Sequence, residues 1–386
     1  GWMHGDIKGA FLSDTDTTNI TSGEILSNGD FTNGTTGWTV QNTNEGSISS
    51  SSNQLTLNNS TSSDPPVACY QQISLEVGKY YNLISSKASG LNAVVNITTG
   101  TSDGGGTGGY GNVIYHQNNI EQSATFLATA STMYCYIRVN TNATGTAVMN
   151  FVSIRKAEED RSVNSAFLRD KVSALTINGT VTKSAVATGA ELVAYSGFSG
   201  SNVLVQPYNS NLNPGTGDYS FMLWFKCPST SGEQMIMRRF AVPTVTGGMM
   251  MRIVSSSSVL QWYVRDTSSS ATTIQSPNAV DDGNWHCAVG TRQGSTANLY
   301  LDGVLVTTQT CSANSHDPGT NADLVIGAEE VSASPGTYQN PADLCSLTLV
   351  RYSLSAPSAE QIKKMYEDEK MLFQENAACT LYGSSD

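Results

Sequence analysis

The sequence has few charged residues. Only 13% of its 386 residues are Asp, Glu, Lys or Arg, about half the usual share for a soluble domain. Acidic residues outnumber basic ones by 32 to 20, which gives a net charge of −12. A negative chain repels phosphate backbones and anionic lipid, and no cluster of Lys and Arg offsets this repulsion. The composition therefore argues against nucleic acid as a partner.

Long apolar runs are also missing. No segment approaches the roughly 18 apolar residues that a membrane-spanning helix needs, so we expect no membrane insertion. The first residues, GWMHGDIKGAFL, lack the basic segment followed by an apolar one that marks a targeting signal. We expect a chain that either stays in the compartment where it is made or leaves as part of something larger.

The cysteines show no metal-binding or redox spacing. There are seven, spread singly, without a Cys-x-x-Cys pair and without a His at zinc-ligand spacing. This pattern predicts reduced, mostly buried thiols in a protein that folds in a cytosol. The residues are Cys69, Cys135, Cys227, Cys287, Cys311, Cys345 and Cys379.

Short strand-like segments make up most of the chain. Runs rich in β-branched and aromatic residues, separated by Gly, Asn and Ser turns, fill residues 25–156 and 176–357. Residues 1–24 are expected to form an arm with one strand that leans on another part of the protein. Residues 157–175 are the most charged stretch and are expected to form a connector.

Strand registers are harder to assign. In the segment MYCYIRVN, alternation among Tyr134, Tyr136, Ile137 and Val139 is visible only after a shift by one residue. A slip of one residue moves every side chain to the other face of a strand, so the register of this segment stays open.

The last part of the chain, residues 358–386, predicts a helix and a tail. Pro357 precedes Ser358-Ala-Glu-Gln361, a capping box whose side chains satisfy the first free amides of a helix. Apolar residues then recur at helical spacing, and the helix is expected to pack on the edge of a sheet. These residues are Ile362, Met365, Tyr366 and Phe373.

The segment from Gly283 to Thr310 raises the question of a catalytic histidine. Strand alternation places Trp285 with Cys287 and Val289 on one face, so that His286 faces the other side. Catalysis by His286 would need a nucleophile or a carboxylate held against it. The pair Asp302-Gly303 accepts the positive φ angles of a tight hairpin turn, so we interpret Asp302 as a turn residue.

Several motifs in residues 176–370 resemble laminin-G or concanavalin-A-like lectin domains. They are GTGDYSFMLWFK, GNWH, LYLDGVLV, DLVIGA and LTLVRYSLSAPSAEQIKKMY, in that order. The resemblance implies two antiparallel sheets packed face to face. In such domains the tryptophan and the hairpin are markers of the fold, which favours a structural role for Trp285 and His286.

Residues 25–156 resemble the jelly-roll carbohydrate-binding modules that are attached to polysaccharide-degrading enzymes. The motifs are ILSNGDFTNGTTGWTV, ACYQQISLEVGKYYNLISSKAS and AVMNFVSIRK. Members of that group hold a structural calcium near the first strand, and Asp30 would be a ligand of it. Thr32 and Asn150 stand where further acids would help, which argues against calcium there. Trp38 is expected in the core.

The expected fold class is therefore all-β, with two antiparallel β-sandwich (jelly-roll) domains in tandem and a short C-terminal helix. The two ends, GWMHGDIKGAFLSDTDTT and YEDEKMLFQENAACTLYGSSD, resemble segments of long structural proteins of marine tailed phages. This implies an excised part of a virion tail or surface fibre, made in the bacterial host cytoplasm, with other virion protein segments as partners. A homo-oligomer would fit such a role, although no heptad run enforces a trimer.

The carboxylates do not form a hydrolase signature. Laminarinase-type enzymes of this fold place acids in a Glu-x-Asp-x-x-Glu run so that two of them face one sugar. That run is missing, and neighbours such as Glu329-Glu330 would point to opposite faces of a strand. We therefore expect a protein that is not an enzyme.

Binding of a sugar is the remaining hypothesis. Aromatic rings stack on sugars while amide and carboxylate groups take the hydroxyls. Candidate sugar contacts are Tyr110, Tyr115 and His116 in the first domain, and Tyr208, Trp262 and Arg265 in the second. For each of these residues ordinary packing is the competing interpretation. Asp317 and Asp323 are candidate calcium ligands at a sandwich rim, with backbone carbonyls completing the shell.

The main hypothesis is thus a non-catalytic adhesion segment that recognises a glycan or polysaccharide of a bacterial surface. The alternative is a purely structural or decorative virion segment that binds no sugar, and glycan hydrolysis is a lesser alternative. Saturable, glycan-specific binding would distinguish the first hypothesis from the second.

Overall fold

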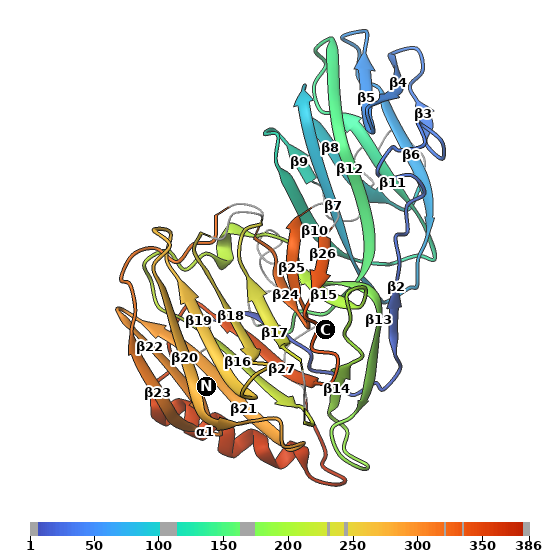
Figure 1. The fold of residues 1–386 in the computed structure, drawn as a ribbon. Coiled ribbons are helices and arrows are strands. Elements are labelled where there is room, and N and C mark those ends of the chain that lie inside the picture. Colours follow the sequence, from blue (N-terminus) through green and yellow to red (C-terminus); the bar gives the residue numbers. More distant parts are fainter. Residues whose placement is uncertain are drawn as a thin grey trace. The chain divides into compact units, whose positions relative to one another are not determined.

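The fold is known from a computed structural model, which describes residues 7–100, 114–162, 174–229, 232–242, 246–319, 322–333 and 336–380 (Figure 1). The chain is almost entirely antiparallel β-structure, and α1 (Ala359–Glu369) is the one α-helix of the described residues. The predicted all-β sandwich fold with a short C-terminal helix is confirmed. None of the described helices is long and apolar enough to cross a membrane.

The chain divides into two compact units. Gly23–Ala157 form one of them, which we call the middle unit. Gly1–Ser22 and Glu158–Asp386 form the other, which we call the discontinuous unit.

The middle unit is a sandwich of two antiparallel sheets around a buried core that includes Leu55, Leu83 and Ile137. Its five-stranded sheet has the order β3 (Thr39–Gln41), β6 (Ala68–Ser74), β11 (Thr132–Val139), β8 (Ala93–Thr98) and β9 (Ile114–His116). The facing sheet pairs β4 (Gly46–Ser51), β5 (Gln54–Asn59), β12 (Gly145–Glu158), β7 (Tyr80–Gly90) and β10 (Glu121–Leu127) in that order.

The discontinuous unit is a second sandwich. One sheet runs through β14 (Val193–Ser196), β27 (Ser346–Ser353), β16 (Tyr219–Lys226), β21 (Trp285–Gln293), β22 (Thr296–Leu301) and β23 (Val304–Thr310), and β1 (Ile7–Phe11) also pairs with β27. The other runs through β15 (Val203–Gln206), β24 (Leu324–Ile326), β17 (Gln234–Arg239), β18 (Gly248–Ile253), β19 (Val259–Arg265) and β20 (Ala271–Ala279). The long strand β13 (Leu175–Ala185) pairs with β14, β15 and β2 (Ile20–Ser22), and β25 (Glu329–Ala333) forms a hairpin with β26 (Gly336–Gln339).

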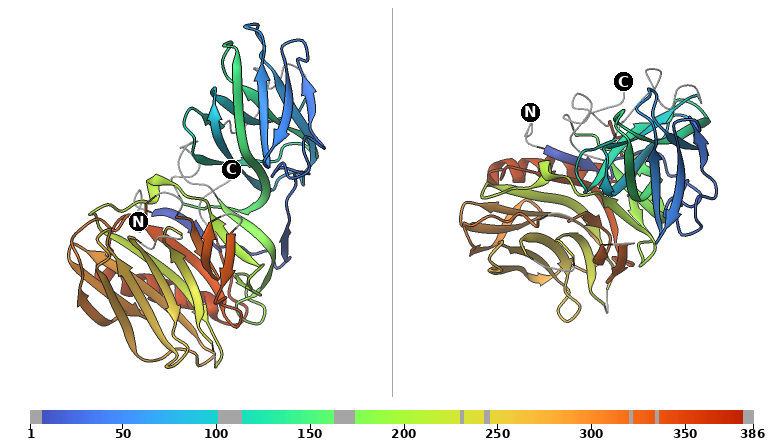
Figure 2. Two further views of the ribbon diagram at one scale, coloured as in Figure 1. Left: turned by 45° about the horizontal axis from the view of Figure 1, so that its top comes forward. Right: turned by 90° about the horizontal axis from the view of Figure 1, so that it is seen from above.

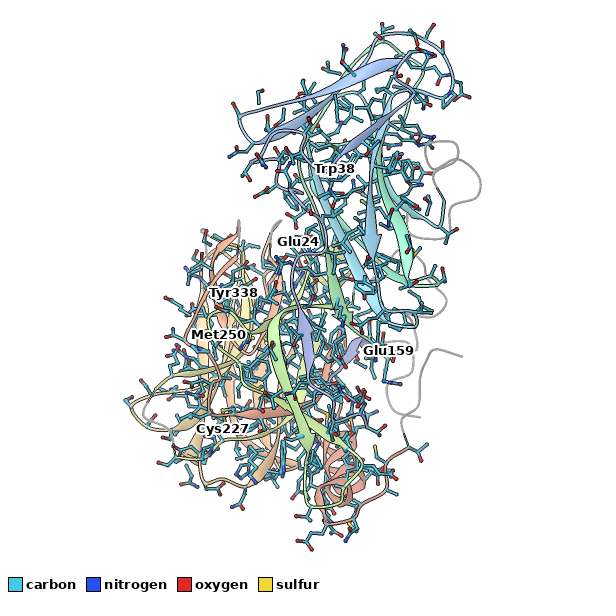
Figure 3. The ribbon with its side chains drawn as sticks, turned by 90° about the vertical axis from the view of Figure 1, so that its right-hand side faces the viewer. Glu24, Trp38, Glu159, Cys227, Met250 and Tyr338 are labelled. Carbon is cyan, nitrogen blue, oxygen red and sulfur yellow. A yellow bond between two sulfur atoms is a disulfide. The ribbon has the colours of Figure 1, made fainter. Side chains whose placement is uncertain are left out.

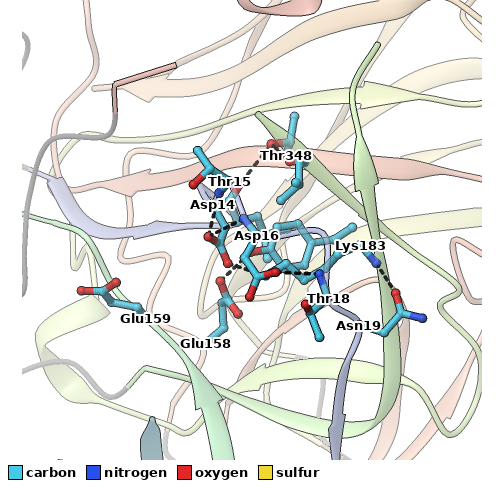
Figure 4. A network of polar contacts seen from close by, with 12 residues as sticks. Asp14, Thr15, Asp16, Thr18, Asn19, Glu158, Glu159, Lys183 and Thr348 are labelled. Atoms are coloured by element: carbon cyan, nitrogen blue, oxygen red, sulfur yellow. Dashed lines mark hydrogen bonds and ion pairs between the residues drawn. The ribbon is translucent and has the colours of Figure 1, made fainter. Parts of the chain in front are cut away.

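A polar network fixes the N-terminal residues within the discontinuous unit (Figure 4). The buried ammonium of Lys183 pairs with Asp14, and the backbone amide of Lys183 donates to Asn19 Oδ1 over 3.0 Å. The buried Glu158 carboxylate accepts a hydrogen bond from the Tyr195 hydroxyl. Thr348 on β27 donates to the carbonyl of Leu12 over 3.0 Å. The first described strand therefore belongs to a sheet of this unit.

The helix α1 covers a face of a sheet, as Figure 2 shows, and the expectation that it would pack on a sheet edge is wrong. Its capping box is confirmed, since Ser358 and Gln361 bond to each other's backbone amides. Strand β16 carries large apolar side chains on both faces, so its outer face also needs cover. The side chain of Trp224 lies on this outer face of β16. Its ring stacks on the rings of Tyr366 and Phe373, with centroid distances of 5.5 and 4.2 Å.

The expectation that all cysteines are reduced is also wrong. Cys227, labelled in Figure 3, forms a disulfide with Cys345. The two residues are 118 apart in sequence, but they flank β16 and β27, which pair with Lys226 opposite Ser346. Their contact therefore depends on the sheet order and not on the spacing of the cysteines. The remaining described cysteines are free, and all but Cys379 are buried.

Candidate functional site

The outer face of the five-stranded sheet in the middle unit gathers aromatic and polar side chains. Along β11, side chains alternate between the two faces of the sheet because a strand repeats every two residues. Met133, Cys135, Ile137 and Val139 point into the core. Tyr134, Tyr136 and Arg138 consequently share the opposite, outer face.

Pairing with the neighbouring strands extends this outer face into rows. Tyr136 lies opposite Tyr70 of β6 and Asn96 of β8. The next row pairs Tyr134 with Gln72 and Thr98, and the row on the other side pairs Arg138 with Ala68 and Val94. Val94 in turn lies opposite Tyr115 of β9. We call this surface the tyrosine face, and it comprises Tyr70, Gln72, Asn96, Tyr115, Tyr134, Tyr136 and Arg138.

The tyrosine face has a buried centre and accessible margins. Tyr136 is fully buried, and its ring supports that of Tyr70 at a centroid distance of 5.1 Å. Tyr70 also contacts Tyr134 edge to face at 5.9 Å, and both rings are partly exposed. Gln72 is exposed, and Tyr115 is exposed over 54% of its surface. Rings held in place by other rings, with amides beside them, can stack on a sugar and bond to its hydroxyls.

The sequence-predicted sugar contacts of the middle unit have different outcomes. Tyr115 lies on the tyrosine face, and Tyr110 lies outside the described residues. The prediction that His116 contacts a sugar is wrong. His116 follows Tyr115 on β9, and neighbouring residues of a strand point to opposite faces of the sheet. It is fully buried between the sheets, with Nε2 at 2.8 Å from the hydroxyl of Ser85. Burial, together with the charge of Lys87, lowers the pKa of His116 to about 4, so the ring is neutral at pH 7. Because the ring is buried, it cannot contact a sugar.

In the discontinuous unit, three predicted residues lie around one guanidinium. Arg239 is fully buried, and its electrostatic partners include Tyr208, Asp317 and Asp323. The Tyr208 amide donates to Asp323 Oδ1 over 2.8 Å, and the Gly215 amide donates to Asp317 Oδ1 over 2.6 Å. Burial raises the pKa of Asp323 to about 6. Both carboxylates thus tie loops together at this end of the sandwich.

Calcium binding stays a prediction for all three candidate aspartates. Within the described ranges, no three His, Cys, Asp or Glu side chains lie close enough to hold a metal ion. Calcium at Asp317 and Asp323 would therefore depend on backbone carbonyls. Asp30 lies in the middle unit, where its Oδ1 accepts a hydrogen bond from Thr32 Oγ1 over 3.0 Å.

The prediction that Trp262 contacts a sugar is also wrong. Its side chain is fully buried in the core of the discontinuous unit, where a Cβ on Gly290 would lie only 2.4 Å from the indole ring. Both faces of the indole are therefore occupied by protein, and the ring cannot stack on a sugar. Arg265, three residues further along the same strand, is partly exposed.

His286 is held by two carboxylates. Its Nδ1 lies 2.8 Å from Asp302 Oδ2, and its Nε2 lies 3.2 Å from Asp282 Oδ1. The hydrogen bond that the His286 ring donates to the Asp302 carboxylate raises the pKa of His286 above its ordinary value, against the effect of burial. Asp302 also accepts from the backbone amide of Cys287 over 2.8 Å. Because both ring nitrogens are engaged, His286 fastens the hairpin turn and is not placed to activate a nucleophile.

The signal for the tyrosine face was present in the sequence. Tyr134, Tyr136 and Arg138 follow each other at every second position, which is the period of one strand face. The alternation was obscured because the apolar residues Ile137 and Val139 of the opposite face follow directly.

A family model confirms the lectin-like fold of the discontinuous unit. Residues 198–359 match the concanavalin A-like lectin/glucanases superfamily, of the laminin-G type. Among curated proteins, none matches this sequence.

Several solved structures are similar to the chain at low identity. The binding domain of Paraclostridial Mosquitocidal Protein 1 is 12% identical with a TM-score of 0.42, over 55% of this chain and 49% of that one. The botulinum neurotoxin serotype D ligand binding domain in complex with N-acetylneuraminic acid is 13% identical with a TM-score of 0.40, over 55% and 48%. Domain 4 of an arabinanase from Geobacillus stearothermophilus, in complex with arabinotriose, is 15% identical with a TM-score of 0.36, over 50% and 88%. The chain spans about half the length of the first two.

Proposed function

We propose that this chain is a non-catalytic carbohydrate-binding protein and that the tyrosine face contacts the sugar. The observation that carries the proposal is the placement of Tyr70 and Tyr134, which are partly exposed, touch each other and share one sheet face with amide side chains. The match of residues 198–359 to a superfamily of lectins and glucanases supports the same ligand class.

Binding fits the described residues better than hydrolysis does. Glycosidases of the usual kind need two carboxyl groups facing one sugar. The residues of the tyrosine face include no carboxylate. In the discontinuous unit, Glu329 pairs with Arg238 at 3.4 Å, and Asp282 and Asp302 both hold His286. These acids have structural partners, which leaves them poorly placed for acid and base catalysis.

We further propose that the protein serves in adhesion, as part of a virion tail or surface fibre that recognises a bacterial surface glycan. The support is the resemblance of the two ends of the chain to structural proteins of tailed phages. Calcium at the Asp317 and Asp323 rim is part of this proposal, and a chelator tests it. Loss of glycan binding in chelator, restored by calcium, is the result expected if the ion supports the loops there.

A glycan array is the first experiment. The full chain would be applied to bacterial and algal glycans, alongside Tyr70→Ala, Tyr134→Ala and the control Tyr263→Ala. Tyr263 is also partly exposed and ring-packed, but it lies on β19 of the discontinuous unit. One lost stacking contact is worth about 1 kcal/mol, which weakens binding roughly five-fold.

The variants distinguish the outcomes. Saturable binding that weakens in the Tyr70 and Tyr134 variants, and not in the Tyr263 variant, supports the tyrosine face. Equal binding by all proteins would refute this location, and loss only in the Tyr263 variant would move the site to the discontinuous unit. A blank array would favour the structural role for the chain.

A further inference from the structure

Arg138 is an unpaired cation on the tyrosine face. Its side chain is partly exposed, and its Nε is shielded from solvent without a hydrogen-bond acceptor. Among the described residues, no carboxylate forms an ion pair with its guanidinium. A shielded donor without an acceptor costs free energy, so its retention at this position needs a reason.

Most of the other arginines that the structure describes have structural partners. Arg155 of the same unit pairs with Glu24, and Arg161, Arg238, Arg252 and Arg351 also pair with glutamates. The fully buried Arg239 and Arg292 donate to backbone carbonyls. A shielded Nε without an acceptor also occurs at Arg239, Arg265 and Arg292. Arg138 differs from the paired arginines in having aromatic rings as neighbours on its face.

The position of Arg138 suits a charged group on a ligand that stacks on the tyrosines. It stands four residues from Tyr134 on β11, roughly 13 Å along the strand, and one row from Tyr70 of β6, so that one short oligosaccharide can reach both accessible rings and the guanidinium. A guanidinium binds carboxylate and sulfate-like groups through two parallel hydrogen bonds. A neutral sugar offers only hydroxyls and leaves the charge of Arg138 without a counterion.

We propose that the tyrosine face selects an acidic glycan, whose carboxylate or sulfate binds Arg138 while its rings stack on Tyr70 and Tyr134. This inference rests on the proposed carbohydrate binding at the same face. The chain carries a net charge of −12 and repels polyanions in general. Recognition of an acidic glycan therefore depends on this local cation and not on the overall field of the protein.

Matched polymers test the proposal by titration calorimetry on the full chain. Polygalacturonate and its methyl ester share a backbone and differ in charge, and chondroitin with its sulfated form separates carboxylate from sulfate. Laminarin and agarose serve as neutral polymers. A charge-assisted hydrogen bond is typically worth a factor of about 10 to 100 in affinity, so the ester should bind that much more weakly than the acid.

Three variants assign the effect to the residue. Arg138→Gln should lose the same factor of about 10 to 100 for the acidic polymers and bind neutral ones as before. Arg138→Lys keeps the charge without the planar fork and should recover part of the affinity. Arg155→Gln removes a guanidinium of the same unit that lies on β12, outside the tyrosine face, and should change nothing.

The outcomes separate this inference from the proposed function. Equal affinity for acid and ester, or an unchanged Arg138→Gln variant, overturns the acidic selectivity. If, in that case, neutral polymers still bind and Tyr70→Ala weakens their binding, the proposal of carbohydrate binding at the tyrosine face is kept and only the acidic selectivity is rejected. If no polymer binds, both proposals fall. A preference for either the carboxylated or the sulfated polymer that Arg138→Gln removes supports the inference.

Discussion

The buried His116 predicts how the middle unit responds to acid. Its ring is fully enclosed between the two sheets and bonded to the Ser85 hydroxyl, and burial holds its pKa at about 4 against an ordinary 6.5. Between pH 4 and pH 6.5, His116 is therefore protonated in the unfolded chain and neutral in the folded unit. The folded state is favoured above pH 6.5, and this advantage is lost as the pH falls.

The size of the effect follows from the shift. Each pKa unit corresponds to about 1.4 kcal/mol, so the free energy of unfolding should fall by about 3 kcal/mol between pH 7 and pH 4 on account of this residue. The variant His116→Gln keeps a polar group beside Ser85 but does not titrate. The free energy of unfolding of this variant should not show the fall of about 3 kcal/mol between pH 7 and pH 4. Subtracting the two pH dependences removes the contributions of all other titrating groups, which both proteins share.

The measurement must report on the middle unit alone. Trp38 belongs to this unit, and its indole nitrogen donates to the carbonyl of Asn28 over 3.2 Å. Urea unfolding would be followed by the NMR signal of the Trp38 indole proton and repeated at several pH values. It would give the pH dependence of the free energy of unfolding for the wild type and for His116→Gln. Parallel pH dependence in wild type and variant, or a His116 ring that titrates near pH 6.5, would refute the reasoning.

Three further predictions concern the discontinuous unit. The pKa of His286 should fall in Asp302→Asn, since the hydrogen bond that raises it is removed; an NMR titration with no change would contradict this. Because that pKa is raised in the fold, charged His286 stabilises the unit at low pH, and this contribution is lost as the pH rises through it. Gly290→Ala should cost about 1–3 kcal/mol or more, seen as a lower melting temperature, because its Cβ meets Trp262 at 2.4 Å. Cys227→Ser should cost about 2–4 kcal/mol by opening the disulfide, and an unchanged melting temperature under reductant would argue against the bond.

Local signals were sufficient for the turns, the helix start and the fold class. The Ser358 capping box and the Asp302-Gly303 hairpin each depend on a few consecutive residues, and both are present, with φ of 52° at Asp302 and 78° at Gly303. Sheet order is a property of residues far apart in the chain. The helix location and the disulfide depend on it, so the sequence alone gave wrong answers for both.

The candidate site was predicted only at its margin. Tyr115 was identified from its polar neighbours, whereas Tyr70 and Arg138 were missed because the register of β11 was not fixed. Trp262 and His116 were selected for their chemistry, and their burial could not be judged from residue type. A strand that is apolar on one face and aromatic on the other is the pattern that would have identified the face.

The division of the chain also has a consequence for synthesis. All pairings of the middle unit's sheets lie within one continuous stretch, so this sandwich can form as soon as that stretch has left the ribosome. The first described strand of the discontinuous unit pairs Ile7 with Ser353 and must wait until the residues of β27 have been made. During translation β1 is thus made long before the strand that it pairs with, and until then its open edge needs protection from wrong pairing.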